Sequence, residues 1–377
     1  MTAAPLRLAV LPDYREEGWP SMDLCADMLL ANLPADVAGT VVRPRFVRAA
    51  GRILGQRPAG FNADRVLNRH LLYPRFARRH AADFEAYHVV DHSYAQLLHA
   101  LPAGRTGVYC YDLDAFRCLV DQAADPRPRW FRALARRTLG GLQKAAVVFL
   151  ISAAVGADLR RLGLVDPDRL RLVPLGVAPE FTAEAPAGAV PPAWLADLGD
   201  APVIAHVGSG IPRKRIDVLL DVTAAVRTRV PNVRLVKVGG EFTPAHRDQI
   251  RRLGLADALV HRTGLTRAEL AAVYRRADVV LVPSKGEGFG LPVIEALACG
   301  AAVVATDLTV LHEAGGPAAD YAPLADIPAW TELVCRRITA PREVAAVAGR
   351  LTWAARFTWA AHAQQVAAEY RRLAGRA

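Results

Sequence analysis

The sequence lacks the features that mark an exported or membrane-spanning chain. Its longest apolar run, Ala145–Ala157, is shorter than the roughly 20 residues needed to cross a bilayer. The first residues show no basic, apolar and small-residue segments in the order of a signal peptide. The five cysteines, at positions 25, 110, 118, 299 and 335, are odd in number and include no CxxC pair. We therefore expect a reduced, cytoplasmic protein, with peripheral contact at the inner face of the membrane left open.

Two further absences narrow the class of protein. The expected first strand is followed by PDYREEGWPS, which contains no GxGxxG loop and so disfavours a dinucleotide-dependent oxidoreductase. No internal repeat and no low-complexity tract interrupts the chain. With 377 residues, 52% of them hydrophobic and 22% charged, the chain has the composition of a globular protein with two ordinary domains.

Positive charge is abundant but unevenly distributed. The net charge is +10, and the segment Arg43–Arg79 holds ten arginines against one acid, Asp64. Arginine clusters suit phosphates, so this basic segment admits nucleic acid, anionic lipid head groups or a pyrophosphate-linked acceptor. An arginine-rich surface without any partner fits the same residues equally well.

The C-terminal half predicts a parallel sheet covered by helices. Between Pro202 and Tyr321, short β-branched runs alternate with amphipathic stretches. We expect strands at 202–208, 233–240, 258–264, 278–284 and 301–307, and helices at 216–230, 244–255, 267–277 and 291–299. Strands that are apolar along their whole length are buried on both faces, which is typical of a parallel sheet.

The N-terminal half shows the same alternation less clearly. Strands are expected at 6–11, 86–93, 107–113 and 146–152, with helices at 22–33 and 155–162 and a terminal helix at 353–373. Residues 175–200, rich in proline, alanine and glycine, mark a boundary. We therefore predict two doubly wound α/β domains, 1–180 and 181–352, followed by a terminal segment, 353–377. Such domains bind ligands in a cleft at the carboxyl ends of their strands.

The most informative string is GEGFGLPVIEALACG, Gly286–Gly300. Its first glycines allow a tight turn and a close approach to a ligand, Pro292 suits a first helical turn, and Gly300 suits the position after a helix. The helix N-terminus presents free N–H groups that favour phosphate. Glu287 precedes this helix and Glu295 lies one turn inside it, so both carboxylates can meet sugar hydroxyls. For either glutamate alone, a solvated loop charge or a first-turn charge would explain the residue as well.

This string resembles the E-x7-E signature of retaining glycosyltransferases of family 4, the glycosyl transferases group 1. The resemblance covers nearly the whole chain and implies the GT-B architecture, with two Rossmann-like domains facing a cleft and a C-terminal helix packing back on the N-terminal domain. It implies that Glu287 contacts the transferred sugar and that Glu295 holds the ribose hydroxyls. The loop between them would bind sugar and phosphate through Gly288, Phe289, Gly290, Leu291 and Pro292.

The string HVGSGIPRKRIDVLL, His206–Leu220, resembles the second donor motif of the same family. Lys214 matches the pyrophosphate lysine of that motif, and Gly208 belongs to its glycine turn. Ser209 stands where many members carry an arginine, so Arg213 is the candidate substitute. A basic pair here can neutralise the charge that grows on a departing nucleoside diphosphate. The neighbouring Arg215 is expected to be solvated.

Weaker candidates lie at other expected strand ends. The base and ribose are expected near Gly239, Gly240, Thr263 and Gly264, although strand-ending glycines are common turn residues. In the N-terminal half, the candidates for sugar or acceptor contacts are Gly18, Trp19, His92, Tyr111 and Asp112. Many family members have a histidine where Tyr111 stands, and a lone histidine such as His92 is often structural.

The resemblance implies a retaining, metal-independent hexosyltransferase without a cofactor. Its donor would be a nucleoside-diphosphate sugar, of the GDP-mannose or UDP-hexose type, and its acceptor a hydroxyl of a glycan or lipid-linked molecule in cell-surface polysaccharide synthesis. Lys214, Arg213 and the helix N-terminus would replace a metal ion, and Glu287 would orient the sugar without acting as a nucleophile. We expect no nucleic-acid partner, and possible peripheral contact with anionic membrane through the basic segment.

Two alternatives remain open on the same fold. A nucleotide-sugar epimerase would bind the donor similarly but needs acid and base groups on both faces of the sugar. A non-catalytic nucleotide-sugar-binding subunit would fit the departures at Ser209 and Tyr111.

Overall fold

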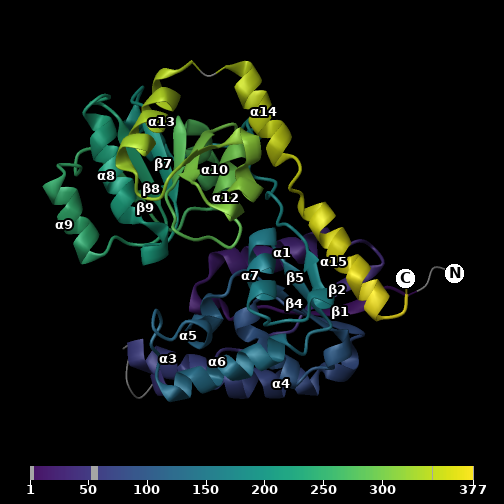
Figure 1. Cartoon of the computed structure of the whole chain (residues 1–377). Helices are drawn as coiled ribbons and strands as arrows, with labels where there is room; N and C mark the ends of the chain where they lie inside the picture. Colours follow the sequence, from purple (N-terminus) through teal and green to yellow (C-terminus); the bar gives the residue numbers. More distant parts are fainter. Residues whose placement is uncertain (1–3, 52–57, 342, 377) are drawn as a thin grey trace. The chain divides into compact units, whose positions relative to one another are not determined.

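The computed structural model describes residues 4–51, 58–341 and 343–376, which form two compact units. Unit 1 contains the chain up to Gly176 together with the residues from Trp359 onward, and unit 2 runs from Val177 to Thr358. The chain therefore passes from unit 1 to unit 2 and back again (Figure 1). The sequence placed these two boundaries at 180/181 and 352/353.

Unit 1 is built on a six-stranded parallel sheet with the order β2-β1-β3-β4-β5-β6. Its strands are β1 (Leu6–Leu11), β2 (Val37–Val41), β3 (Ala86–Val89), β4 (Thr106–Cys110), β5 (Val147–Leu150) and β6 (Leu170–Leu172). The side chains of β3, β4 and β5 are buried throughout, because helices cover both faces of the sheet. The strand order reverses between β1 and β3, as in a flavodoxin-like doubly wound sheet.

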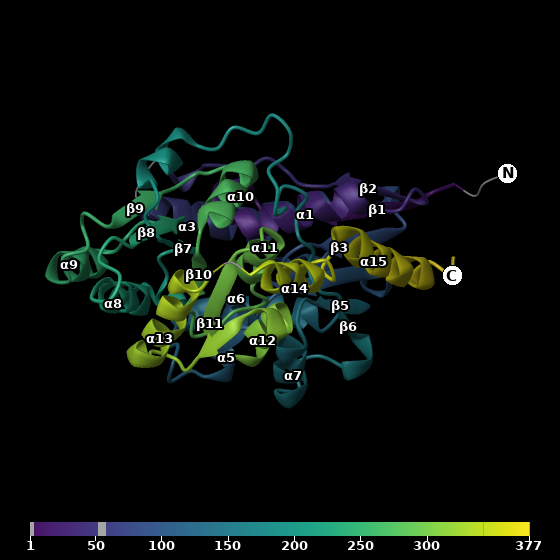
Figure 2. The same ribbon diagram turned by 90° about the horizontal axis from the view of Figure 1, so that it is seen from above.

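The helices of unit 1 lie on both sides of this sheet (Figure 1). They are α1 (Pro20–Asn32), α3 (Pro58–Leu67), α4 (Tyr73–Arg79), α5 (Arg117–Val120), α6 (Arg129–Leu142), α7 (Ala153–Arg161) and α15 (Trp359–Leu373). A π-helical turn at Asn68–Leu72 joins α3 to α4, and short 3-10 helices lie at Arg15–Glu17, Ala81–Asp83, His92–His99, Ala103–Arg105, Asp114–Phe116 and Pro167–Arg169. The terminal helix α15 packs beside α1, so it completes unit 1 (Figure 2).

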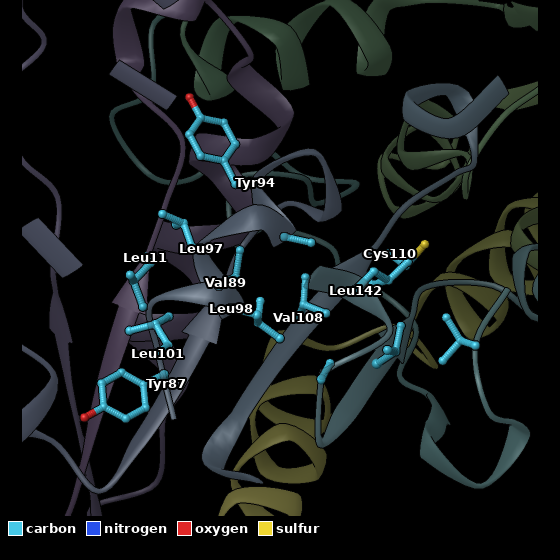
Figure 3. Close-up of a cluster of buried hydrophobic side chains, with 14 of the residues drawn as sticks. Leu11, Tyr87, Val89, Tyr94, Leu97, Leu98, Leu101, Val108, Cys110 and Leu142 are labelled. Carbon is cyan, nitrogen blue, oxygen red and sulfur yellow. The ribbon is translucent and has the colours of Figure 1, made fainter. Parts of the chain in front are cut away.

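An apolar core of unit 1 lies between the sheet and the helices α4 and α6. Figure 3 shows Val89 and Val108, on neighbouring strands, facing Leu97 and Leu98 of the 3-10 helix His92–His99. Leu142 at the end of α6 belongs to the same core. These side chains are almost completely buried, which fixes the carboxyl ends of β1, β3 and β4 next to one another.

Unit 2 has its own six-stranded parallel sheet with the order β12-β11-β10-β7-β8-β9. Its strands are β7 (Val203–Val207), β8 (Arg234–Val238), β9 (Leu259–Arg262), β10 (Val279–Val282), β11 (Ala302–Thr306) and β12 (Asp320–Ala322). Numbered within the unit, this is the 3-2-1-4-5-6 order of a mononucleotide-binding pair. The strand order reverses between β7 and β10, which is where such sheets bind ligands.

The helices of unit 2 also cover both faces of its sheet (Figure 1). They are α8 (Ile216–Arg227), α9 (Pro244–Arg252), α10 (Arg267–Arg276), α11 (Leu291–Ala298), α12 (Thr309–Gly315), α13 (Ile327–Thr339) and α14 (Val344–Ala354), with 3-10 helices at Ala193–Leu198, Pro212–Lys214 and Gly316–Ala318. Capping boxes at Thr243 and Thr266 begin α9 and α10 by satisfying free backbone N–H groups. The predicted pair of doubly wound α/β domains is therefore confirmed.

One sequence prediction about the helices is wrong. The stretch 353–373 was expected to be a single helix, but α14 ends at Ala354 and α15 begins at Trp359. Between them, the N–H of Val177 donates to the carbonyl of Phe357 at 3.0 Å, and Val177 pairs with Thr358 in a parallel bridge. The stretch contains no proline or glycine, so this pairing with a distant segment interrupts the helix.

The run Ala145–Ala157 is a buried strand leading into a helix, as its length predicted: it contains β5 and the first part of α7. Among the helices that the structure describes, none combines the length and apolar composition needed to cross a bilayer.

Candidate functional site

The strongest candidate site lies at the carboxyl ends of β7 and β10, which are paired neighbours in unit 2. After β7 the chain forms the turn Gly208–Gly210 and then the 3-10 helix Pro212–Lys214. After β10 it forms the loop that leads to α11 at Leu291. The two predicted donor motifs therefore meet at the point where the strand order of the sheet reverses.

The glycines of this site allow two backbone segments to touch. A Cβ on Gly210 would lie 2.4 Å from the carbonyl oxygen of Glu241, and a Cβ on Gly239 would lie 2.5 Å from the carbonyl oxygen of Gly208. The N–H of Gly240 also donates to Gly208 O at 3.1 Å. Because no larger residue fits, the predicted residues Gly208, Gly239 and Gly240 shape the turn that precedes Lys214.

Lys214 and Glu287 form an ion pair across the two loops. The Lys214 ammonium donates to Glu287 Oε1 at 2.6 Å, and the two side chains are only 14% and 7% exposed. The N–H of Lys285 donates to the carbonyl of Arg213 at 2.9 Å, which ties the loops together beside this pair. The structure thus brings three residues predicted to act on the donor, Arg213, Lys214 and Glu287, into adjoining loops.

The neighbouring Arg215 has a different role. It adopts the left-handed conformation with φ of 50° and ends the 3-10 helix. Its guanidinium forms hydrogen bonds to both carboxylate oxygens of Asp217, at 2.8 to 3.0 Å, in the first turn of α8. Arg215 therefore supports the local turn; it was expected to be solvated, but its side chain is only 23% exposed because it pairs with Asp217.

The N-terminus of α11 lies at the end of the second loop. Gly290 precedes the helix with φ of 112°, no side chain caps its first N–H groups, and Pro292 occupies its first turn. Such an end carries a partial positive charge and suits an anion. Phe289 is buried and packs edge-on against Phe357, so its side chain belongs to the apolar interior.

Glu295 lies one turn inside α11 and is buried, with 6% of its surface exposed. The hydroxyl of Tyr274 in α10 donates to Glu295 Oε2 at 3.0 Å. Burial raises the pKa of Glu295 to about 7, and the hydrogen bond from Tyr274 opposes that rise. This carboxyl group therefore titrates near neutrality.

His206 and Ser284 complete the surroundings of the site, and the sequence analysis did not select them. His206 Nδ1 lies 2.9 Å from the carbonyl of Leu281, which fixes the ring, and burial lowers its pKa to about 4. The ring is therefore neutral and lies behind Gly208, where an added Cβ would come within 3.1 Å of Nε2. Ser284 is fully buried directly after β10.

Thr263 and Gly264 lie farther from this centre. They follow β9, the edge strand, which is separated from β7 by β8. Both residues are exposed, and Gly264 has φ of 66°. Because β8 separates them from the strand that leads to Lys214, Thr263 and Gly264 could contact only the far end of an elongated ligand.

A second polar cluster lies at the carboxyl ends of β1, β3 and β4 in unit 1. His92 is buried between two carboxylates: Nδ1 lies 3.1 Å from Asp91 Oδ1, and Nε2 lies 3.4 Å from Asp112 Oδ1. Burial alone would lower the pKa of His92, but these carboxylates raise it above its ordinary value. The structure therefore joins two predicted acceptor residues, His92 and Asp112, and adds Asp91.

The same cluster contains buried charges that the sequence analysis did not select. Glu17 accepts hydrogen bonds from Tyr94 at 2.6 Å and from Arg65 at 3.1 Å, and Arg69 lies 3.3 Å from it. Asp13 is 2% exposed, and its pKa lies well above the ordinary value because of burial and the neighbouring Asp91. Asp13 follows β1 closely, so its position at a strand end was the available signal.

The other acceptor candidates of unit 1 have different surroundings. Gly18 has φ of 70° in the turn before α1, and Trp19 is 47% exposed beside it. Tyr111 is 5% exposed and lies beside Cys25, so its ring belongs mainly to the interior. Of these three residues, only Trp19 offers a large accessible surface.

The basic segment is divided by the fold into inward and outward arginines. Arg43 donates to the carbonyl of Asp13 at 2.6 Å, and Arg65 and Arg69 pair with Glu17. Arg52 and Arg57 lie outside the described residues. The exposed arginines are Arg45, Arg48, Arg75, Arg78 and Arg79.

No group of three or more His, Cys, Asp or Glu side chains that could hold a metal ion occurs in the described parts of the chain. Asp112 and Asp114 have Asp-x-Asp spacing after β4, but the N–H of Asp114 donates to Asp112 Oδ1 at 3.0 Å, which forms a local turn.

The fold agrees with the comparisons to known proteins. Over 99% of this chain and 100% of the other, the structure superposes with a TM-score of 0.75 on sucrose-phosphate synthase from Thermosynechococcus elongatus, at 19% identity. This likeness defines the fold class as GT-B, as predicted.

The family follows from the sequence of unit 2. Residues 201–339 match the family described as glycosyl transferases group 1. The MMP alpha-(1->4)-mannosyltransferase of Mycolicibacterium hassiacum is 32% identical over 228 residues, which is 57% of this chain and 53% of that protein. A GDP-mannose-dependent alpha-(1-6)-phosphatidylinositol monomannoside mannosyltransferase of Mycolicibacterium smegmatis is 35% identical over 168 residues, 41% of this chain and 43% of that protein.

The predicted resemblance to the glycosyl transferases group 1 is confirmed for unit 2, where residues 201–339 match the family model. The matched regions span about half the length of each of these two relatives.

Proposed function

We propose that this protein is a retaining hexosyltransferase that uses a nucleoside-diphosphate sugar. The observation that carries the proposal is the meeting of Lys214 and Glu287, 2.6 Å apart, at the strand-order reversal of a group 1 domain. Lys214 and the N-terminus of α11 would stabilise the negative charge of the departing diphosphate. Arg213 would add a second positive charge from the same turn.

Glu287 would orient the sugar and stabilise positive charge that develops on its ring in the transition state. We do not assign it as a nucleophile, because the covalent route of retaining hydrolases needs a second carboxylate about 5 Å away. Glu295 lies one turn deeper and its carboxyl is held by Tyr274, so it would accept hydrogen bonds from the ribose hydroxyls.

The donor is proposed to be GDP-mannose or a UDP-hexose. The name of the relative from Mycolicibacterium smegmatis specifies GDP-mannose, which supports the first choice. A thermal-shift screen of nucleotide-sugars tests this, because a ligand that binds only the folded state raises its stability.

We propose that unit 1 binds the acceptor molecule. The support is a group of buried polar side chains at the carboxyl ends of β3 and β4, Asp91, His92 and Asp112, with the exposed Trp19 on the turn after β1. We propose a glycan or a lipid-linked molecule as the acceptor, in cell-surface polysaccharide synthesis.

The decisive experiment is an assay of transfer with the wild-type protein and the variants Lys214→Ala and Glu287→Ala. Each variant is expected to lose about 10²–10³-fold in kcat, the usual effect of removing one charge-stabilising group. NMR of the product should show that the anomeric configuration of the donor is retained. Activity in EDTA should be unchanged, since Lys214 and the helix end are proposed to replace a metal ion.

Two outcomes would contradict the proposal and favour another function. Isomerised nucleotide-sugar in the absence of acceptor would indicate an epimerase. A protein that binds the donor, but shows neither transfer nor slow hydrolysis of it, would indicate a non-catalytic binding subunit. In that case Glu287→Ala would leave donor binding unchanged.

We also propose peripheral contact with the inner face of an anionic membrane through the exposed arginines of the basic segment, Arg45, Arg48, Arg75, Arg78 and Arg79. Liposome sedimentation should show a preference for anionic lipid that disappears when these five are changed to Gln. Binding that is equal for neutral and anionic vesicles would overturn this part.

A further inference from the structure

The Lys214–Glu287 pair has a consequence for the affinity of the site. At 2.6 Å and with little exposure, the carboxylate neutralises most of the charge that Lys214 would offer to an anion. The pair is built into the loops, because the hydrogen bond from Lys285 N to Arg213 O holds them together. Glu287 is therefore a fixed negative charge beside the residue assigned to the diphosphate.

This arrangement affects the donor and the product differently. In the intact donor, sugar hydroxyls can donate to Glu287 and offset its repulsion of the phosphates. On transfer, the bond from the anomeric carbon to the β-phosphate oxygen breaks and the bond to the acceptor oxygen forms. The acceptor proton passes to the leaving phosphate or to solvent. The nucleoside diphosphate that remains has one more ionisable oxygen and no sugar hydroxyls to cover Glu287.

We propose that Glu287 promotes release of the nucleoside diphosphate product by competing with it for the Lys214 ammonium and by repelling its phosphates. This inference rests on the proposed function, in which Lys214 binds the diphosphate. Where release of product limits turnover, as it does in many enzymes, a carboxylate that weakens product binding raises the rate of the whole cycle. Glu287 thus has two tasks: it orients the sugar before transfer and weakens diphosphate binding afterwards.

The test is equilibrium binding of GDP and UDP, measured by calorimetry with no acceptor present. Glu287→Gln keeps the shape of the side chain and removes its charge. It is expected to bind the preferred diphosphate about three- to tenfold more tightly than the wild-type protein, the effect of removing one nearby like charge. Lys214→Met should bind it at least tenfold more weakly.

A matched control is Asp257→Asn, which makes the same chemical change in another ion pair of unit 2. Asp257 pairs with Arg227 at 2.9 Å and precedes the edge strand β9, so it lies at the amino ends of the strands, whereas the site lies at their carboxyl ends. This variant should leave the affinity for diphosphate unchanged. Glu287→Ala provides a second test if the Gln variant does not fold, and it should change affinity in the same direction.

The outcomes separate this inference from the function on which it rests. If Lys214→Met weakens binding but Glu287→Gln leaves it unchanged or weaker, the release role of Glu287 is wrong and the donor site stands. If neither Lys214→Met nor Glu287→Gln changes the affinity, the proposed donor site itself is wrong. Tighter binding in Glu287→Gln, together with weaker binding in Lys214→Met, supports both.

Discussion

The hydroxyl of Tyr274 donates to Glu295 Oε2 at 3.0 Å, inside unit 2 and away from solvent. Tyr274 lies on α10 and Glu295 on α11, so two helices cooperate to hold one carboxyl group. The ring of Tyr274 packs edge-on against Phe181, with 5.8 Å between ring centroids. Tyr274 is thus fixed and acts as a positioning residue for the proposed ribose contact.

Tyr274→Phe is expected to weaken nucleoside diphosphate binding about fivefold at pH 7, which corresponds to about 1 kcal/mol, the typical net contribution of one intramolecular hydrogen bond. Loss of the hydroxyl also raises the pKa of Glu295 further above about 7, since that hydrogen bond lowers it. Affinity in the wild-type protein should therefore rise with pH through about 7, and in the variant the rise should move to higher pH. Calorimetry between pH 6 and 8.5 measures both effects.

Tyr321→Phe is the matched control for this change. Tyr321 donates to the carbonyl of Gly316 at 2.9 Å, in another part of unit 2. An identical pH profile for wild-type and Tyr274→Phe proteins would show that Tyr274 has no influence on Glu295.

Gly210→Ala should disrupt the turn before Lys214. Its new Cβ would lie 2.4 Å from the backbone oxygen of Glu241, so the two loops must separate. We expect a lower melting temperature and nucleotide binding too weak to measure by calorimetry. Gly349→Ala is the control, because nothing lies within 4 Å of its added Cβ and it occupies the helix α14. This change should instead stabilise the protein by about 0.5–1 kcal/mol. Equal stability of the two variants would contradict the close packing of the loops.

Arg69→Met should destabilise unit 1 strongly. The Arg69 guanidinium lies 3.3 Å from Glu17, donates to Ser93 at 2.6 Å and lies over the ring of Tyr94. Removing one member of a buried ionic group leaves the carboxylates uncompensated, which costs about 3–5 kcal/mol. Urea denaturation should show this loss, whereas Arg78→Met, at an exposed position, should change stability by about 0.5 kcal/mol or less. A loss in Arg69→Met as small as that in Arg78→Met would mean that the cluster is not ionised.

Acid should destabilise unit 1 through buried histidines of its α15 interface. His362 Nδ1 lies 2.9 Å from the carbonyl of Pro174, and its Nε2 meets the hydroxyl of Tyr109. Burial lowers the pKa of His362 to about 4 and that of His88 to about 3, against 6.5 for an ordinary histidine. As pH falls below about 6.5, these histidines become protonated in the unfolded chain but stay neutral in the folded chain. The free energy of unfolding should therefore decrease between pH 6.5 and 4.

His362→Gln tests this interpretation by chemical denaturation at several pH values. Its stability should depend less on pH across the same window, by an amount on the order of 3 kcal/mol for one histidine. His80→Gln serves as the control, since that ring is 44% exposed and its removal should leave the wild-type pH dependence intact. Parallel curves for wild type and His362→Gln would show that this group does not contribute.

Much of the fold was predictable because local sequence and tertiary structure agree. Nearly all side chains of β7, β8 and β10 are buried, and these strands are rich in β-branched residues, so composition alone predicts them. The strands β2, β6 and β12 were not predicted. β6 and β12 have three residues each, and β2 is an edge strand with mostly accessible side chains, so none of them gives a clear pattern.

The candidate site was predictable only where its residues are close in sequence. The resemblance to two family motifs pointed to Lys214 and Glu287, although nothing in the sequence showed that they pair over 73 positions. Tyr274 looks like any apolar residue of a helix, and Arg69 like any member of a basic segment. The partner of Tyr274, Glu295, is 21 positions away and lies on another helix, and the partner of Arg69, Glu17, is far earlier in the sequence. Such contacts arise from packing, which a single sequence does not record.

The discontinuity of unit 1 also affects how the protein is made. The hydroxyl of Tyr370 on α15 donates to the carbonyl of Tyr87 and lies 2.8 Å from His88 Nδ1, in β3. During synthesis the strands of unit 1 leave the ribosome first, but α15 follows only after all of unit 2 has been translated. Until then the apolar surface that α15 covers on the strands of unit 1 is exposed, so unit 2 can fold as a complete domain before unit 1 does. The order of folding is therefore expected to be the reverse of the order in which the two sheets are translated.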